Sequence, residues 1–151
     1  MNPFEISSRA VDLAAFRHSL ADPSCGGYVV FEGWVRDHNE GRAVQRLAYE
    51  VYEPLAMKEG LAIIQEALER FDISHARAVH RAGELDLSEP AVAVGVSAAH
   101  RDAAFRACRY IIDEIKHRLP IWKKEYYADG TAEWVNCRQC ATSHAEHDSA
   151  A

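Results

Sequence analysis

The segment from Lys116 to Tyr127, KHRLPIWKKEYY, mixes five basic side chains with large apolar residues. A lysine pressed against apolar walls or other cations gives up its proton more readily, so it can act as an acid or base near neutral pH. The other interpretation is a surface on which lysine stems cover apolar groups and keep their charges in water. The choice between a cationic pocket and such a surface decides whether this stretch indicates an enzyme.

The periodicity of the flanking elements leaves both interpretations open. On a helix, Lys116 falls about 40° from Ile112, so it borders an apolar stripe. In an extended strand, Lys123 and Lys124 point to opposite faces, and one of them must share its face with aromatic bulk. The two predicted faces are Ile121, Lys123, Glu125 and Tyr127, and Trp122, Lys124 and Tyr126.

Further basic residues stand at positions that can bind anions. His100 and Arg101 follow a predicted strand and open a predicted helix, where free backbone N–H groups and basic side chains can bind phosphate or carboxylate. Alternatively both residues are solvated, and Asp102 supplies the favourable first-turn charge. Arg36 and His38 lie in a polar loop after a strand, a common place for binding residues.

Two cysteines and two histidines near the C-terminus have the residue types of a zinc site. Cys137 and Cys140 form C-x₂-C, and His144 and His147 form H-x₂-H. Four such ligands can hold zinc tetrahedrally, but only three residues separate the two pairs, far fewer than in ordinary zinc fingers. We therefore expect no metal site, and we expect residues 137–151 to form a flexible tail.

Composition makes any anion site a local feature. The chain has 151 residues, with 17 Lys and Arg against 23 Asp and Glu, and its net charge is −6. This balance argues against general affinity for nucleic acid or anionic membranes. No apolar run approaches the roughly 18 residues of a membrane span, and no secretory signal opens the chain. Four unevenly spaced cysteines favour a reducing cytoplasm over a disulfide framework.

The elements that must position these residues can be predicted from periodicity and turn signals. We expect residues 1–136 to form a single domain. Strands are predicted over 28–35, 45–53, 76–82, 91–98, 121–127 and 132–136, with the first two forming a hairpin. Long helices are predicted from Pro54, with Met57, Leu61, Ile64, Leu68 and Phe71 as its stripe, and over 101–119, with Phe105, Cys108, Ile112, Ile115 and Leu119. A short helix is predicted over 10–20. This order predicts an α+β fold with a mainly antiparallel β-sheet and two principal helices packed on it.

The chain resembles the large, catalytic subunit family of molybdopterin synthase in several blocks that keep their order and spacing from about Gly27 to Arg138. The blocks are Phe31–Arg42, Tyr49–Tyr52, His80–Leu85, Val96–Arg101, Ala103–Phe105, Asp113–Lys116, Pro120–Glu125 and Trp134–Val135. The resemblance favours the pocket interpretation of the Lys116–Tyr127 segment. After Arg138 no family pattern is present.

The resemblance implies an enzyme that places two sulfurs on cyclic pyranopterin monophosphate and so makes the dithiolene of molybdopterin. The implied donor is the C-terminal thiocarboxylate of a small ubiquitin-like partner subunit, within a heterotetramer of two large and two small subunits built on a homodimer. The implied catalytic residues are Lys116 and Lys123, and the implied anion-binding residues are Arg36, His100, Arg101 and Arg138, some acting across the dimer. No cofactor or cysteine nucleophile is expected, because the sulfur arrives on the partner.

Two other classes of function stay open at this stage. One is a non-catalytic module whose basic groove accepts an acidic peptide tail. The other is a cysteine-based or zinc-based sulfur carrier that uses Cys137 and Cys140.

Overall fold

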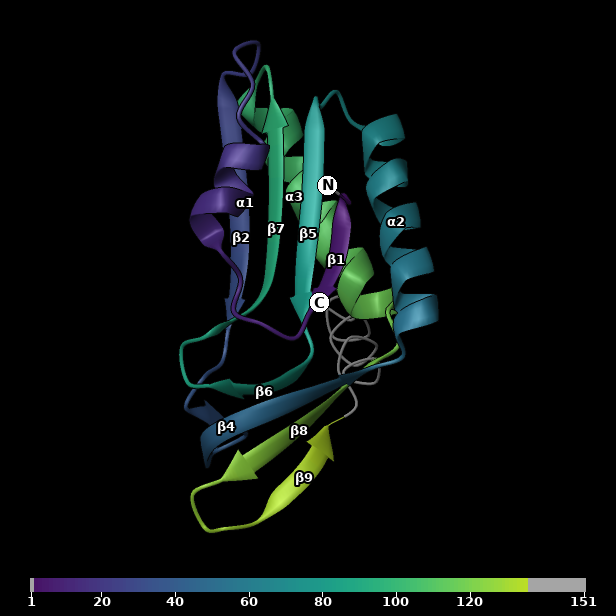
Figure 1. Cartoon of the computed structure of the whole chain (residues 1–151). Helices are drawn as coiled ribbons and strands as arrows, with labels where there is room; N and C mark the ends of the chain where they lie inside the picture. The colour runs from purple at the N-terminus through teal and green to yellow at the C-terminus, as the bar shows by residue number, and fades with distance from the viewer. Residues whose placement is uncertain (1, 136–151) are drawn as a thin grey trace, which may run out of the picture.

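Residues 2–135, which the computed structural model describes, form two β-sheets with the long helices on one face of the first sheet (Figure 1). The first sheet has the strand order β1-β5-β7-β2. These strands span Phe4–Ser7, His75–Arg81, Pro90–Ala98 and Gly27–Trp34. Only β1 and β5 run parallel; the other neighbours are antiparallel.

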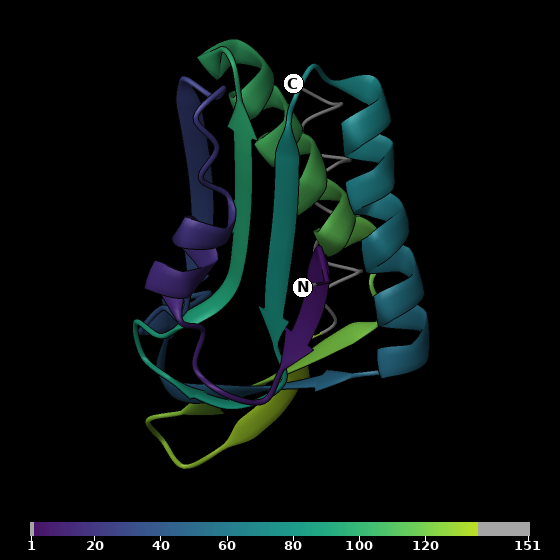
Figure 2. The ribbon, with the colours of Figure 1, turned by 45° about the horizontal axis from the view of Figure 1, so that its top comes forward.

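The central strand β7 is buried on both faces, which explains its almost continuous apolar sequence PAVAVGVSA. On one face, Val94 and its neighbours pack against helices α2 (Glu53–Arg70) and α3 (Arg101–Arg118). On the other face, Ala93 packs against the short helix α1 (Leu13–Ser19). Figure 2 shows α2 and α3 side by side, with α1 on the opposite side of the sheet.

The second sheet carries Lys123 and lies at the end of the first sheet (Figure 1). Its order is β3-β4-β8-β9, and β6 also pairs with β4. The strands are β3 (His38–Asn39), β4 (Arg42–Val51), β6 (Gly83–Asp86), β8 (Ile121–Tyr127) and β9 (Ala132–Val135). Pro120 separates α3 from β8, so the helix end and the strand are covalently close.

The structure confirms the predicted α+β class, with mainly antiparallel strands and two principal helices in a single domain. It corrects the predicted hairpin between residues 28–35 and 45–53. Strand β2 pairs with β7, whereas β4 enters the second sheet. The loop between them forms its own small hairpin, with Glu40 and Gly41 at φ 50° and 78°. Strands β1 and β6 were not foreseen, because each has only four residues and gains its stability from its sheet neighbours.

The structure confirms most of the predicted helix stripes, with Ile64, Cys108, Ile112, Ile115 and Leu119 buried, and corrects three of their residues. Leu61, Leu68 and Phe105 are 38%, 37% and 58% exposed. Small residues take their place against the sheet: Ala56, Gly60 and Ala67 in α2, and Ala103, Ala104 and Ala107 in α3. A Cβ atom on Gly60 would lie 2.2 Å from the Phe4 ring, so close packing of α2 on β1 requires glycine there. Periodicity in large apolar residues extended the stripe to these three positions because it did not show that alanine and glycine make the closest contacts with the sheet.

No helix in residues 2–135 is both long enough and apolar enough to cross a membrane.

Candidate functional site

Lys123 lies in the middle of β8 and is half-buried. Its cross-strand partner on β4 is Tyr49, and directly opposed residues place their side chains on the same face of a sheet. The same face of β8 carries Glu125 and Tyr127, which are only 3% and 5% exposed. The predicted alternation along the strand is therefore the observed one, and Lys123 lies on its inner face.

Lys124 occupies the outer face of β8. Its ammonium lies 5.3 Å from the centre of the Tyr126 ring and 5.6 Å from that of the Trp134 ring. Such contacts between a cation and exposed aromatic rings contribute about 0.5–1 kcal/mol. Aromatic rings thus lie on both faces of β8, and the ammonium of Lys124 is the one that stacks on the rings of the outer face.

His80 is linked to both predicted catalytic lysines: to Lys116 by its charge, and to Lys123 through Tyr49. Its ring makes an edge-to-face contact with Tyr49, with ring centres 4.9 Å apart, and Tyr49 is the partner of Lys123. His80 is 7% exposed, and burial together with the positive charge of Lys116 lowers the pKa of its imidazole to about 4. Lys116 itself is exposed near the end of α3. The charge of Lys116 on α3 thus acts on His80, and Lys123 on β8 lies opposite Tyr49, the ring that His80 contacts.

Arg36 is tied to the inner face of β8 through Asn39. The guanidinium Nη2 of Arg36 donates to Asn39 Oδ1 at 3.5 Å, and Asn39 Nδ2 donates to Glu125 Oε1 at 2.6 Å. The Tyr127 hydroxyl also donates to Glu125 Oε1, at 3.4 Å. Glu125 and Lys123 are two residues apart on one face of β8. These bonds therefore place Arg36 at the end of the molecule that carries Lys116 and Lys123, which we call the lysine end.

His100 and Arg101 lie at the other end of α3. Arg101 begins the helix and Lys116 follows fifteen residues later, which corresponds to about 22 Å along the axis. The start of β2 confirms this placement, since a Cβ on Gly27 would lie 3.4 Å from Arg101 Cα, and β2 then leads away toward Arg36. Both residues are exposed, and no side chain caps the helix at His100. Within one chain, His100 and Arg101 do not join Lys116.

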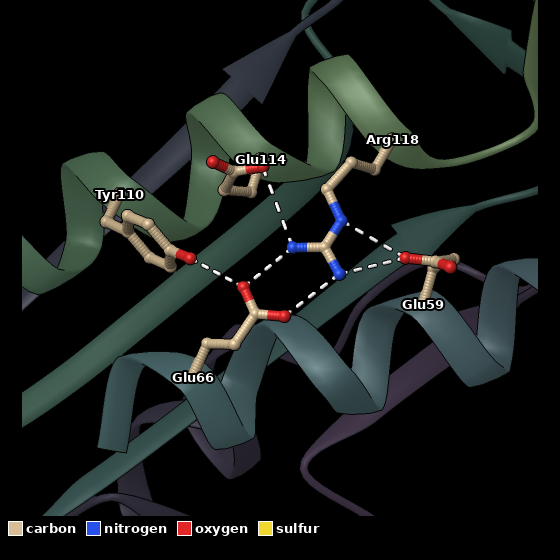
Figure 3. A network of polar contacts seen from close by, with 5 residues as sticks. All are labelled: Glu59, Glu66, Tyr110, Glu114 and Arg118. Atoms are coloured by element: carbon tan, nitrogen blue, oxygen red, sulfur yellow. Dashed lines mark hydrogen bonds and ion pairs between the residues drawn. The ribbon is translucent and has the colours of Figure 1, made fainter. Parts of the chain in front are cut away.

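A different basic residue, Arg118, is fully engaged in a network between α2 and α3 (Figure 3). Its guanidinium donates to Glu66 at 2.7 and 3.0 Å and to Glu59 at 2.9 and 3.1 Å, and it lies 3.7 Å from Glu114. Tyr110 donates a further hydrogen bond to Glu66 at 2.5 Å. Hydrogen bonds from Arg118 and Tyr110 lower the pKa of Glu66 to about 2.

Arg138 and the Cys137, Cys140, His144 and His147 cluster lie outside the described residues. Within residues 2–135, no group of three or more His, Cys, Asp or Glu side chains is arranged to hold a metal ion. Cys108 is buried in the core, where desolvation raises the pKa of its thiol to about 11. Two cavities of about 190 and 480 Å³ lie along β1, α1 and β5, and neither is lined by a predicted site residue.

Four residues of this region were not singled out from the sequence: Tyr49, His80, Asn39 and Glu125. Strand alternation did place Glu125 on the face of Lys123, but local periodicity does not reveal that a carboxylate is buried. The contact between Tyr49 and His80 joins β4 to β5, so it depends on how the two sheets meet.

Comparison with known proteins defines the family of this chain. The model of a family described as "MoaE protein" matches residues 6–118, and the chain belongs to that family. A Pyrococcus abyssi protein named molybdopterin synthase catalytic subunit is 49% identical over 111 residues, which cover 74% of this chain and 75% of that protein.

Solved structures agree with this assignment. The crystal structure of molybdopterin synthase from Staphylococcus aureus matches with a TM-score of 0.85 and 37% identity, covering 90% of this chain and 98% of that one. A complex of subunits 1 and 2 of the molybdopterin-converting factor from Helicobacter pylori matches with a TM-score of 0.75 and 20% identity, covering 89% and 91%, and shows the same fold. The chain is accordingly an enzyme of molybdenum cofactor biosynthesis, in the molybdopterin-forming part of that process.

Proposed function

We propose that the chain transfers sulfur from the C-terminal thiocarboxylate of a small ubiquitin-like partner subunit to cyclic pyranopterin monophosphate, forming the dithiolene of molybdopterin. In this proposal Lys116 and Lys123 are the catalytic residues. The anionic groups of substrate and donor are bound by Arg36, His100, Arg101 and Arg138. The reaction belongs in the cytoplasm, where free thiols such as those of Cys25 and Cys108 stay reduced.

The observation that carries the proposal is a group of cations without carboxylate partners in an acidic chain. Lys116, Lys123 and Arg36 form no ion pair with any residue in 2–135, although Asp and Glu outnumber Lys and Arg by 23 to 17. Cations that folding leaves uncompensated attract anionic ligands. A cyclic phosphate and a thiocarboxylate are two such ligands.

The chemistry needs proton transfer at the place where the anions bind. Each sulfur transfer forms a carbon–sulfur bond on the substrate and turns the donor thiocarboxylate into a carboxylate, with water supplying the oxygen. Opening of the cyclic phosphate leaves an oxygen that must receive a proton. A positioned ammonium can supply that proton, and the resulting amine can accept one from water. Two lysines on different elements allow these two roles to be separated.

The partner subunit of the proposal has support from the relatives. The Pyrococcus abyssi protein is named a catalytic subunit, and the Helicobacter pylori structure with the same fold is a complex of two different subunits. An extended acidic tail that carries the thiocarboxylate would meet the cations of α3 and β8 without needing a deep cavity.

The proposal also includes a homodimer, because one chain does not assemble all its anion-binding residues. His100 and Arg101 lie about 22 Å along α3 from Lys116, so they can serve a lysine site only if a second copy supplies them. Exposed apolar side chains are available for such an interface on β2 and α3: Phe31, Trp34 and Phe105. We propose two large and two small subunits in the active complex.

The decisive experiment mixes the chain with a thiocarboxylated small subunit and cyclic pyranopterin monophosphate and detects the dithiolene product. A small subunit that ends in an ordinary carboxylate is the matched control and should give no product. Binding without turnover would instead indicate a non-catalytic module for acidic tails. A persulfide or bound metal on the purified chain would indicate the sulfur-carrier alternative.

Sharing of the site across the dimer can be tested by complementation. Lys116→Ala and Arg101→Ala chains should each be weakly active alone. In a mixed dimer, the lysines of one chain and the arginine of the other rebuild one intact site, so random mixing should restore about a quarter of wild-type activity. Absence of any recovery, or a fully active monomer by light scattering, would contradict the shared site.

A further inference from the structure

We propose that the cavity of about 480 Å³ beside Arg77 binds a small organic acid. The guanidinium of Arg77 holds the carboxylate or phosphate group of this ligand, and apolar side chains surround its carbon body. The site is separate from the lysine end, so it is independent of the proposed sulfur transfer.

Arg77 carries a positive charge into a nearly closed environment. It lies on β5, and its side chain is only 10% exposed. Its guanidinium carbon lies 5.3 Å from the centre of the Phe16 ring of α1. Moving a charge out of water is costly unless an anion pairs with it. The partners of Arg77 therefore decide whether the fold itself compensates this charge.

The fold supplies Arg77 with little negative charge. Its Nη1 atom donates at 2.5 Å to the Ser19 hydroxyl, which is neutral and itself donates to the Phe16 carbonyl at 2.6 Å. Within residues 2–135, the only carboxylate at ion-pair distance is that of Glu5, which lies 3.5 Å from Nη2 and is 41% exposed. The Nε atom is enclosed and has no partner in the described residues. Most of the five N–H donors of this guanidinium thus have no protein acceptor there.

Two other arginines show how the fold compensates a shielded guanidinium. Arg81 is 5% exposed and donates to Glu89 at 2.8 Å. Arg118 donates two hydrogen bonds to Glu66, at 2.7 and 3.0 Å. Arg77 donates no hydrogen bond to a carboxylate within residues 2–135. An anionic ligand would complete the pairing that the other two arginines obtain from the protein.

The larger of the two cavities gives such a ligand room. Its volume of about 480 Å³ lies within the roughly 300–1,000 Å³ of small-molecule sites. It lies near the starts of β1 and β5, where the Ala78 N–H donates to the Pro3 carbonyl at 2.9 Å. Polar groups at its wall include those of Arg77 and Ser74, and apolar groups come from Pro3, Leu20 and Leu68. A cation beside apolar walls matches an acid with an apolar carbon body.

The charges around the two cavities show which one suits an anion. The smaller cavity, of about 190 Å³, is lined by Glu5 and Asp12, whose carboxylates repel an anion. Among the described residues, no Asp or Glu lines the larger cavity. His75 at its wall is bound through Nε2 to Asp22 at 2.8 Å, and Asp22 also accepts hydrogen bonds from the backbone and hydroxyl of Ser24. The Asp22 carboxylate is thus already engaged, and the guanidinium provides the charge for the ligand.

The larger cavity lies at the end of β5 away from the second sheet (Figure 1). His75 begins this strand, and His80, which contacts Tyr49 opposite Lys123, follows five residues later. Five residues of strand span about 16 Å. A small acid in this cavity therefore does not reach Lys123, and both sites can be occupied together.

The test is a titration of the full chain with benzoate, phenyl phosphate and the neutral benzyl alcohol, followed by NMR chemical shifts and calorimetry. We expect saturable binding of at least one acid at millimolar concentrations, with shifts at Arg77, Ser74 and Leu68, and much weaker binding of benzyl alcohol. The tighter acid shows whether the site takes a carboxylate or a phosphate group. Arg77→Met, which removes the charge but keeps an apolar side chain, should lower the affinity about 10–100-fold. Equal affinity for wild type and a folded Arg77→Met would overturn the inference, as would equal binding of benzyl alcohol.

A second variant tests the cavity without changing Arg77. Leu68→Trp fills the cavity from α2 and should lower the affinity for the acid by a similar factor. The matched control is Leu61→Trp on the same helix, because Leu61 is 38% exposed against 37% for Leu68 and does not line the cavity. Its affinity should equal that of wild type. Equal affinities for the two tryptophan variants would show that the acid binds elsewhere.

The lysine end is the other place where an acid could bind, and a third variant separates the two. A chain with both Lys116→Ala and Lys123→Ala should bind the acid as tightly as wild type does. Loss of binding in this chain, with full binding in Arg77→Met, would place the acid at the lysine end and overturn the inference. Binding that depends on Arg77 in a chain that makes no dithiolene would support this inference and contradict only the proposed function.

Discussion

Lys116 and Arg118 are two residues apart at the end of α3, yet their surroundings are opposite in charge. At about 100° per residue they point to nearly opposite sides of the helix. Arg118 faces α2 and meets three carboxylates, Glu59, Glu66 and Glu114 (Figure 3). Lys116 is exposed, and its charge helps to lower the pKa of the His80 imidazole. Folding therefore pairs Arg118 with carboxylates in a structural network, and it leaves Lys116 without a carboxylate partner in the described part of the chain.

This difference separates two uses of positive charge. The Arg118 network has excess acceptors and fastens the two long helices to each other, so its removal should affect stability first. The cations at the lysine end have no carboxylate partners in the described part of the chain, so their removal should affect anion binding and chemistry first. Substitutions of the two kinds of cation should therefore have different effects on stability and on rate.

The largest effect is expected from Lys116→Ala and Lys123→Ala. Each should lower the single-turnover rate by roughly 10²–10⁴, the range for loss of a positioned acid or base. Partner binding should suffer less, because the donor tail also meets other cations. Arginine at either position should restore substrate binding but not the rate, since a guanidinium stays protonated at any working pH.

Lys124→Ala is the control for these variants, because this lysine lies on the outer face of β8 beside Tyr126 and Trp134. Its rate should be near that of wild type, and its stability should change by about 0.5 kcal/mol or less. An inactive Lys124→Ala with a normal Lys123→Ala would show that the functional face of the strand is the other one.

Acidification should weaken the lysine end before it weakens the Arg118 network. The pKa of His80 is lowered from 6.5 to about 4, so between these values the unfolded chain binds a proton that the folded chain does not. Stability is therefore full above pH 6.5 and is lost as the pH falls toward 4, by about 3 kcal/mol. Urea unfolding at several pH values should show a smaller loss in His80→Gln over this window.

The corresponding effect of Glu66 falls at lower pH. Its pKa is lowered from 4.5 to about 2, so its contribution is present above pH 4.5 and disappears as the pH falls from there toward 2. The window between pH 6.5 and 4 is the one that we assign to His80. If wild type and His80→Gln lost the same amount of folding stability in that window, the assignment to His80 would be wrong.

Arg118→Met should reduce stability by about 1–3 kcal/mol, between the values for exposed and buried ion pairs, because the network is partly exposed. It leaves three carboxylates near one another without their shared cation. Arg109→Met on the same helix is the control, since its pair with Asp113 is exposed and should contribute about 0.5 kcal/mol or less. Urea unfolding measures both, and equal effects would show that the network has no special role.

The smallest effect is expected from deletion of residues 141–151. This segment is polar, terminal and outside the family resemblance, so the rate should stay close to that of the full chain. Loss of turnover on truncation, or on addition of a strong chelator, would show that Cys137, Cys140, His144 and His147 take part.

Several features of the molecule could be predicted from local sequence. Strand β8 was predicted with its observed bounds, Ile121–Tyr127. Its apolar and aromatic residues lie between Pro120, which ends the preceding helix, and the turn at Asp129-Gly130, so both of its ends could be seen in the sequence. Helix α3 was predicted to within a residue for similar reasons. Leu61, Leu68 and Phe105 were wrongly placed on the buried faces of α2 and α3, because small residues, whose packing depends on their partners, make the closest contacts there.

By itself the sequence determined the helices, the six longer predicted strands, and the opposite orientation of Lys123 and Lys124, since these follow from the fixed periods of strand and helix. Its resemblance to a family supplied four candidate anion-binding residues, Arg36, His100, Arg101 and Arg138, which stay a prediction. Only the tertiary structure decided that the charge of Lys116 acts on His80, that His80 contacts Tyr49 opposite Lys123, and that His100 and Arg101 lie at the other end of α3. The physical reason is that side-chain period is a local property, whereas neighbours across β4, β5 and α3 depend on sheet register and helix placement.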